Sequence, residues 1–239
     1  MTYCVGIRVK DGLVFCSDSR TNAGIDQVNA YKKMYTFGVP GQCQFCILVS
    51  GNLATTQSVI NQVKKDIANS ADISLLTVTS VQDAADYIGQ VSLSQQSKTG
   101  GGPVFTANFI IGGQIGNAPH ELAMIYPEGN HIIATERTPF LQIGESKYGK
   151  PILDRIIKPD TDLHTCALCA LVSMDSTVKS NLSVGPPIDI QLYHTGSLAL
   201  GEYYHFDENH EYLRQINTAW NAKLIESFLQ LPPLSESTV

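Results

Sequence analysis

The sequence predicts an α+β fold in which two antiparallel sheets stack face to face and helices cover both outer faces. Strand-like segments come in three groups, and a pair of segments with helical spacing separates each group from the next. This grouping excludes a simple alternation of single strands and helices. With 239 residues the chain can bury one substantial core, so we expect residues 1–239 to form a single domain, with 231–239 as a loose tail.

The first group of strands opens with a hairpin. Residues 3–9 (YCVGIRV) and 12–17 (GLVFCS) are strand-like, and the Asp11-Gly12 step between them is a strong hairpin signal. After a loop that bears Gly and Asn, residues 32–37 and 43–51 are again strand-like. We expect these four strands to lie in one antiparallel sheet.

The spacing of apolar residues changes after Leu53. Two segments repeat at helical spacing: Val59, Ile60, Val63 and Ile67, then Val81, Ala84, Ala85, Ile88 and Val91. Glycines at 100–102 end this pattern, and a second sheet is predicted from 104–113, 121–129 and 131–136. The remaining elements are helices at 147–158 and 162–179, strands at 188–194 and 197–206, and a helix through 212–225.

Charge and hydropathy narrow the functional classes. The chain has 16 Lys+Arg against 22 Asp+Glu, a net charge of -6, and its basic residues are scattered, which argues against a nucleic-acid partner. No apolar run is long enough to span a bilayer, and the N-terminus lacks the basic and apolar regions of a secretion signal. We therefore expect a cytoplasmic protein with no membrane partner.

Two cysteine pairs have the CxxC spacing of a zinc site, Cys43/Cys46 and Cys166/Cys169. Their contexts are a strand and a helix, whereas a zinc knuckle turns through small or polar residues. We interpret them as buried thiols without disulfides, as is usual in a reducing compartment. The six histidines show no HExxH pair, so we expect no metal site.

The glycine-rich stretch Gly112-Gly113-Gln114-Ile115-Gly116 does not open a helix, so we expect a turn rather than a nucleotide-binding loop. The sequence also contains no P-loop. We expect no cofactor, and any ATPase would have to be a separate partner, which the sequence does not reveal.

The second residue carries the strongest chemical signal. Removal of Met1 would leave Thr2 with a free α-amine beside its own hydroxyl, at the entrance of a rigid strand. An N-terminal amine is one recognised base for activating a threonine hydroxyl, and it titrates near neutrality. The plain alternative is an ordinary Thr after an initiator Met.

Two charged residues could support this nucleophile. Asp18 follows the second strand in an Asp18-Ser19-Arg20 cluster that could equally be a polar turn, and Lys33 could equally be a solvated edge lysine. If the hairpin and the third strand are neighbours, Asp18 and Lys33 would converge on residue 2. A cation beside the hydroxyl would favour its deprotonation and keep the amine neutral.

These features together resemble the β-type subunits of proteasomes and, in particular, the bacterial Anbu ("ancestral β subunit") family of N-terminal nucleophile (Ntn) hydrolases. The resemblance rests on Thr2, Asp18-Ser19-Arg20, Lys32-Lys33 before an apolar residue, Ser50-Gly51, the GESKYGKP stretch at 144–151 and SNLSVGPP. It covers the whole chain in length and element order. It implies a four-layer αββα sandwich and a threonine-type endopeptidase.

The resemblance also implies roles for single residues. Thr2 would be the nucleophile and, through its amine, the general base, with Asp18 and Lys33 as the supporting charge pair. Lys33 is chosen over Lys32 because an apolar strand residue follows it directly. Gly51 matches the glycine whose N–H contributes to the oxyanion hole.

The sequence departs from the proteasome pattern after the middle of the chain. The expected Gly-Ser-Gly corresponds to Gly144-Glu145-Ser146, so either Glu145 faces the amine or Ser146 keeps the usual role. The later Asp and Ser correspond to Ser180 and Ser183, and the Asp is missing unless Asp175 replaces it. We expect Ser19, Glu145, Ser146 and Ser183 to be supporting residues, and slow cleavage of ordinary peptides.

The resemblance further implies maturation by loss of Met1 alone and homo-oligomerisation through the outer helices, as a closed ring or an open helical one. The substrate would be a peptide or an unfolded protein. By family position, the pocket for the residue before the cleaved bond would lie around Ile25, Tyr31, Met34 and Thr55, with a mixed to apolar preference.

Two other functions remain open at this stage. One is an Ntn amidase acting on small amides; Cys4 is a conceivable nucleophile for it, but lies two residues too late to be N-terminal. A non-catalytic, ring-forming subunit is the other alternative. Such subunits usually carry an additional N-terminal segment that blocks access, and we expect none here.

Overall fold

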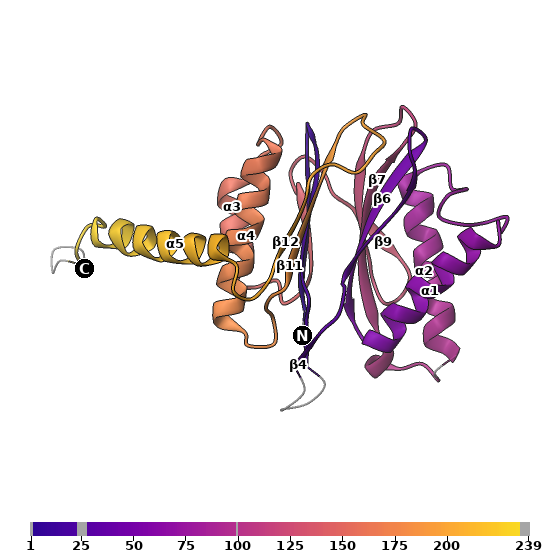
Figure 1. Ribbon diagram of the computed structural model, residues 1–239, viewed down its shortest axis with the longest axis horizontal. Coiled ribbons are helices and arrows are strands. Elements are labelled where there is room, and N and C mark those ends of the chain that lie inside the picture. Colours follow the sequence, from indigo (N-terminus) through magenta and orange to yellow (C-terminus); the bar gives the residue numbers. More distant parts are fainter. Residues whose placement is uncertain (1, 23–27, 99, 235–239) are drawn as a thin grey trace. The chain divides into compact units, whose positions relative to one another are not determined.

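The computed structural model describes residues 2–22, 28–98 and 100–234, and the chain divides into two compact units, Met1–Glu208 and Asn209–Val239. Within the first unit, two sheets stack face to face and helices cover both outer faces (Figure 1). The predicted αββα architecture is therefore confirmed.

Each sheet has five strands, and all paired neighbours are antiparallel. The first sheet runs in the order β10 (Phe140–Gly144), β1 (Tyr3–Val9), β2 (Gly12–Asp18), β11 (Ile188–His194) and β12 (Tyr203–Phe206). The second runs β5 (Met34–Val39), β6 (Cys43–Gly51), β7 (Ala107–Ile115), β8 (Glu121–Ile125) and β9 (His131–Ile133).

Two pairs of helices form the outer layers. Helices α1 (Leu53–Ala68) and α2 (Val81–Lys98) cover the second sheet, and α3 (Lys150–Ile156) and α4 (Leu163–Ser180) lie on the side of the first. The side chains of Asn52 and Asp162 cap α1 and α4 by accepting N–H bonds in the first turn. A short 3₁₀ turn at Pro103–Phe105 precedes β7.

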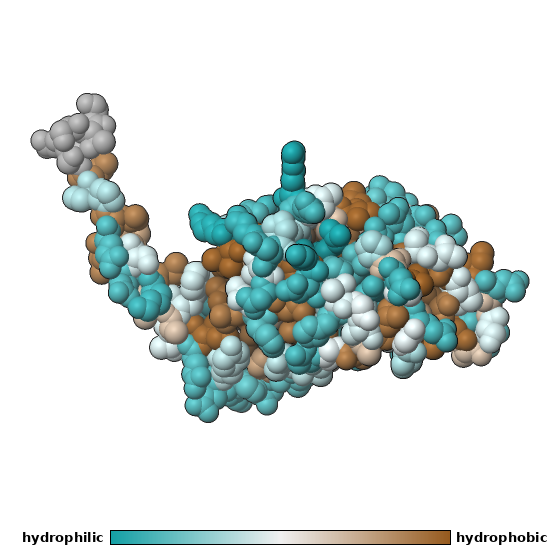
Figure 2. Space-filling model, turned by 90° about the horizontal axis from the view of Figure 1, so that it is seen from above, coloured by the Kyte–Doolittle hydropathy of each residue, from teal (hydrophilic) through white to brown (hydrophobic). Residues whose placement is uncertain are grey.

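The sandwich is apolar on both faces of its sheets, which explains the nearly unbroken apolar runs of β1 and β6. One cluster, which includes Leu13, Phe15, Leu48, Ile110 and Leu122, fills the space between the sheets. Another lies between the second sheet and its helices. Some hydrophobic residues stay outside, in separate patches among hydrophilic ones on the face seen in Figure 2.

The structure corrects the predicted grouping of strands. β1 and β2 lie in the first sheet, whereas β5 and β6 lie in the second, so the first four long strands do not share a sheet. A long connection leads from β2 to β5, and the second sheet gains its pairing from β6 with β7. That connection, predicted as a loop, contains the small sheet of β3 (Arg20–Asn22) and β4 (Val28–Ala30).

Two further elements differ from the prediction. β10 was not foreseen, because its five residues carry only a short apolar pattern. Gly112 and Gly113 lie within β7 rather than in a turn. A Cβ at Gly112 would lie 2.8 Å from the Phe15 ring, so the missing side chain makes room for a large one between the sheets.

The second unit contains helix α5 (Glu211–Leu229), as the apolar spacing predicted. Its N-cap is His210, whose side chain accepts the N–H of Tyr212. Among the described residues, no helix has both the length and the apolar character needed to cross a bilayer.

Packing between the sheets gives the first test. Replacing Phe15, 1% exposed, by Ala should lower the free energy of unfolding by about 3–5 kcal/mol, because it leaves a cavity between two packed sheets. The measurement is urea denaturation, with Ile132→Ala on β9 as control. Ile132 is 42% exposed, so its loss should change stability by less than about 0.5 kcal/mol. Equal effects of the two substitutions would show that the inter-sheet layer does not hold the fold.

Candidate active site

Thr2 lies at one end of the sandwich, where it lines a cavity of about 550 Å³. This end is formed by the last residues of β2, β6 and β10 and the first residues of β1, β5 and β7. The other described residues that line the cavity are Thr21, Lys32, Lys33, Val49, Ser50, Gly51, Leu53, Thr56, Asn108 and Gly144. Both sheets therefore contribute walls to the cavity.

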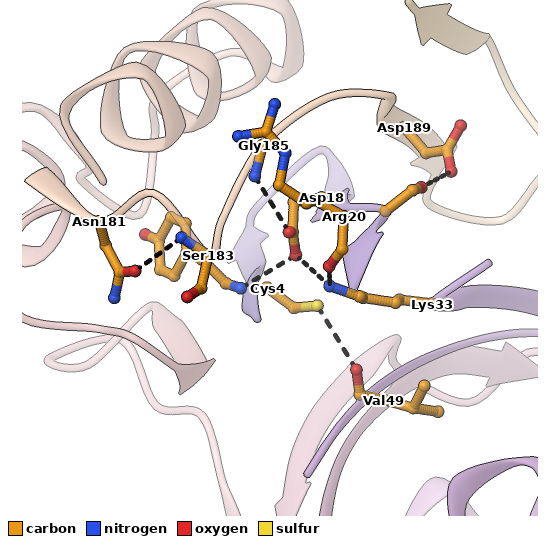
Figure 3. A network of polar contacts seen from close by, with 11 residues as sticks. Cys4, Asp18, Arg20, Lys33, Val49, Asn181, Ser183, Gly185 and Asp189 are labelled. Carbon is orange, nitrogen blue, oxygen red and sulfur yellow. Dashed lines mark hydrogen bonds and ion pairs between the residues drawn. The ribbon is translucent and has the colours of Figure 1, made fainter. Parts of the chain in front are cut away.

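A buried ion pair joins the two sheets beside this cavity. Asp18 ends β2, and Lys33 directly precedes β5; the Lys33 Nζ lies 2.9 Å from the Asp18 Oδ1. The same Nζ donates to the carbonyl of Arg20 at 2.6 Å. Asp18 also accepts the N–H of Tyr3 at 3.0 Å and that of Gly185 at 3.2 Å (Figure 3).

The environment of this pair is almost free of solvent. Asp18 is 0% and Lys33 4% exposed. Burial raises the pKa of Asp18, and the charge of Lys33 and the N–H bonds oppose that shift. Either charge alone would be costly in this position, so each side chain fixes the other. Through the N–H of Tyr3, the pair also fixes the chain directly after Thr2.

A second contact holds Thr2 from the side of β10. The N–H of Glu145 donates to the Thr2 carbonyl at 2.7 Å. Gly144, with φ of +83°, makes this approach feasible: a Cβ there would lie 1.9 Å from the Thr2 oxygen. Any other residue at position 144 would push the turn away from Thr2.

Residues 181–185 connect Glu145, after β10, with Asp18, at the end of β2. The amide of Asn181 donates to the Glu145 Oε2 at 3.1 Å, and its oxygen accepts the N–H of Ser183 at 3.0 Å. Figure 3 shows Asn181 and Ser183 on one side of the Asp18–Lys33 pair. Asn181 lies in the SNLSVGPP motif, but the sequence did not identify it as a site residue. Only the fold shows that its side chain contacts Glu145.

The other predicted site residues lie as follows. Gly51 ends β6 and lines the cavity with Thr2, and Ser146 continues the turn after Gly144, where its N–H donates to the Gly144 carbonyl. The side chain of Ser19 is turned instead toward Asp189, whose Oδ2 it meets at 3.5 Å. Successive residues of an extended chain point to opposite sides, so Ser19 and Asp18 face different groups. The predicted support of Thr2 by Ser19 stays a prediction.

The alternative nucleophile Cys4 is buried between the sheets, and its thiol contacts the carbonyl of Val49 at 3.7 Å. Burial, reinforced by the charge of Asp18, raises the pKa of Cys4 well above its ordinary value. The thiol is therefore protonated near neutral pH and is a poor nucleophile.

The predicted specificity pocket stays a prediction, although Lys32, Lys33 and Thr56, which adjoin three of its residues, line the Thr2 cavity. Of its four residues, Ile25 lies outside the described residues, and Tyr31, Met34 and Thr55 are not among the described residues that line the Thr2 cavity. Met34 is buried between the sheets, and Thr55 uses its hydroxyl to bond the Phe105 carbonyl.

Groups that could hold a metal ion are absent from the described residues. Cys43 and Cys46 lie in β6, and Cys166 and Cys169 lie in α4, as their contexts predicted. All six cysteines are buried thiols.

Comparisons with known proteins agree with this geometry. A family described as proteasome subunit matches residues 2–191. Among solved structures, Anbu from Yersinia bercovieri is similar with 42% identity, a TM-score of 0.94 and coverage of 98% of this chain and 99% of that one. A helical assembly of the Anbu complex from Pseudomonas aeruginosa is similar with 46% identity, the same TM-score and 99% coverage of both chains. A comparison with curated sequences gave no match.

The buried ion pair gives the second test. Lys33→Met should lower the free energy of unfolding by about 3–5 kcal/mol, because it leaves the Asp18 carboxylate buried without its partner. The folded-state pKa of Asp18 then rises further, so the variant should lose stability as pH rises through that value. Urea denaturation at several pH values measures both effects.

The matched control for this test is the double variant Asp18→Asn/Lys33→Met, which removes both charges. It should be more stable than Lys33→Met alone and should not show the added pH dependence. A single variant as stable as the unmodified protein at every pH would contradict the account.

Proposed function

The chain belongs to the proteasome family, in its Anbu branch, and from this premise we propose that it is a threonine-type peptidase with Thr2 as nucleophile after removal of Met1. The observation that carries the proposal is the position of Thr2. It shares a cavity with Lys33 and Gly51, and its neighbour Tyr3 is bonded to Asp18.

In the first half of the reaction, the Thr2 hydroxyl attacks the carbonyl carbon of a peptide bond while the α-amine takes its proton. The Oγ–C bond forms, a negative charge develops on the carbonyl oxygen, and the N–H of Gly51 stabilises it. Losing one donor of this kind costs about 100- to 1,000-fold in rate. The C–N bond then breaks, and the α-ammonium returns its proton to the leaving amine.

In the second half, water attacks the ester formed on Thr2. The α-amine takes a proton from the water and returns it to the Thr2 Oγ as the ester C–O bond breaks, which releases the carboxylic acid and restores the hydroxyl of Thr2. The same amine thus acts twice as base and twice as acid, so no separate histidine is needed.

The role of Lys33 follows from its hydrogen bonds. An ammonium has three N–H bonds, and among the described residues Asp18 and the Arg20 carbonyl accept two of them. Because Lys33 also lines the Thr2 cavity, its positive charge acts on the hydroxyl. A nearby cation lowers the pKa of the hydroxyl and of the amine. The hydroxyl then loses its proton more readily, and the amine is neutral and can accept it.

We also infer that the protein works as a homo-oligomer in the cytoplasm on peptides or unfolded proteins. A relative from Pseudomonas aeruginosa, 46% identical, forms a helical assembly, which supports self-association. Buried thiols without disulfides fit a reducing compartment. An ATPase partner, if one exists, would be a separate protein.

The third test is substitution of Thr2. Thr2→Ala should abolish cleavage of a panel of fluorogenic peptides, and Thr2→Ser should retain part of it, because serine keeps both the hydroxyl and the amine. Thr138→Ala, an exposed site, controls for nonspecific effects.

Three results would decide between the functions left open. Full activity of Thr2→Ala combined with loss in Cys4→Ser would favour a cysteine nucleophile. Hydrolysis of small amides but no peptide, lost in Thr2→Ala, would favour an Ntn amidase. Inactivity of the unmodified protein after confirmed removal of Met1 would favour a non-catalytic subunit.

A further inference from the structure

Residues 181–185 form a strap that contacts the carboxylates of Glu145 and Asp18. At its start, the Asn181 amide donates to the Glu145 Oε2; at its end, the N–H of Gly185 donates to the Asp18 Oδ2. Arg20 holds the strap between these points, because its guanidinium donates to the carbonyl of Leu182 at 3.2 Å. Its N–H also donates to the Gly185 carbonyl at 3.2 Å.

The strap is linked to Thr2 and to Tyr3, the first residue of β1, through Glu145 and Asp18. Glu145 bonds the Thr2 carbonyl through its N–H, and Asp18 bonds the Tyr3 N–H through its Oδ1. One residue, Glu145, links the start of the strap to Thr2, and two residues, Asp18 and Tyr3, link its end to Thr2. Movement of either end would be transmitted to Thr2.

The Asn181 side chain is suited to fixing a carboxylate. Its amide nitrogen donates to Glu145 and its amide oxygen accepts the N–H of Ser183, so the two bonds together fix the orientation of the side-chain amide. A flipped amide would place oxygen against oxygen at Glu145 and nitrogen against nitrogen at Ser183. The orientation of this side chain therefore requires Glu145 as acceptor.

We propose that Asn181 is a positioning residue that holds the Glu145 carboxylate beside Thr2, and that Glu145 thereby serves as the second acid of the site. The proposal rests on the proposed function. It assigns the second acid to Glu145, where the sequence left open whether Asp175 replaces the missing Asp and whether Glu145 or Ser146 faces the amine.

Among the described residues, the charged groups near this end of the sandwich include Glu145 after β10, Asp18 on β2, Lys33 and Lys32 before β5, and Arg20, which pairs with Glu208. Asp18 and Lys33 largely neutralise each other. Glu145 therefore favours the ammonium form of Thr2 and opposes the two lysines. Its removal should leave the amine unprotonated down to a lower pH.

A reversal of the hydrogen bond tests the contact directly. Asn181→Asp places two carboxylates together and should lower kcat/KM about 10-fold or more, with most of the loss in kcat. Adding Glu145→Gln restores the hydrogen bond in the opposite direction, with the glutamine amide as donor and the aspartate as acceptor. The kcat/KM of the double variant should therefore recover to within about threefold of that of Glu145→Gln alone. Asn130→Asp, an exposed site, is the matched control.

A second measurement does not need peptidase activity. The full chain is released from a fusion so that it starts at Thr2, and the rate at which trace acetic anhydride labels its α-amine is followed against pH. Glu145→Gln should shift this titration, and the acidic limb of kcat/KM, down by about half a pH unit. Asn181→Ala should shift both in the same direction by less.

The outcomes separate the two proposals. An amine titration that moves in an inactive protein supports the placement of Glu145 and contradicts the peptidase function. An active protein whose titration is unchanged in Glu145→Gln, or whose double variant is no better than Asn181→Asp, overturns the role of Asn181. If Asn181→Asp changes only urea stability and leaves kcat/KM intact, the contact is merely structural and the proposal fails.

Discussion

The buried ion pair between Asp18 and Lys33 is the interaction on which the site depends. It joins the last residue of β2 to the residue before β5, and so connects the two sheets at the end where Thr2 lies. Neither charge is stable there alone, so the fold must deliver both to the same place. Because Asp18 also bonds the N–H of Tyr3, the ion pair that joins the sheets also fixes the chain directly after Thr2.

The remaining contacts at this end restrict Thr2 from the opposite side. β10 ends in a glycine that lets the Glu145 N–H reach the Thr2 carbonyl, and the 181–185 strap links Glu145 to Asp18. A nucleophile on a chain terminus would otherwise fray. Here it is held through backbone groups: the Thr2 carbonyl accepts the Glu145 N–H, and the N–H of the next residue, Tyr3, donates to Asp18. Gly51 and the neighbouring residues of both sheets complete the walls of the Thr2 cavity.

Local sequence patterns predicted most helices and strands, but they could not predict which distant strands pair with one another. The β1–β2 hairpin follows from Asp11-Gly12, and α1 and α2 follow from their apolar spacing. The separation of β2 from β5 depends on β6 pairing with β7, more than 50 residues later in the chain, which no short window contains. Similarly, the sequence singled out Asp18, Lys33 and Glu145, but Asn181 has meaning only beside Glu145. The side chain of Ser19 could not be oriented until Asp189 was placed next to it.

The central claim is that Thr2, freed from Met1, provides both the hydroxyl and the amine. Its most direct test is the mass of the N-terminal peptide after treatment of the purified protein with an acylating β-lactone. The account predicts a peptide that begins at Thr2 and carries a single acyl group on the Thr2 hydroxyl. A peptide that still begins with Met1, or an acyl group on the sulfur of Cys4, would contradict it.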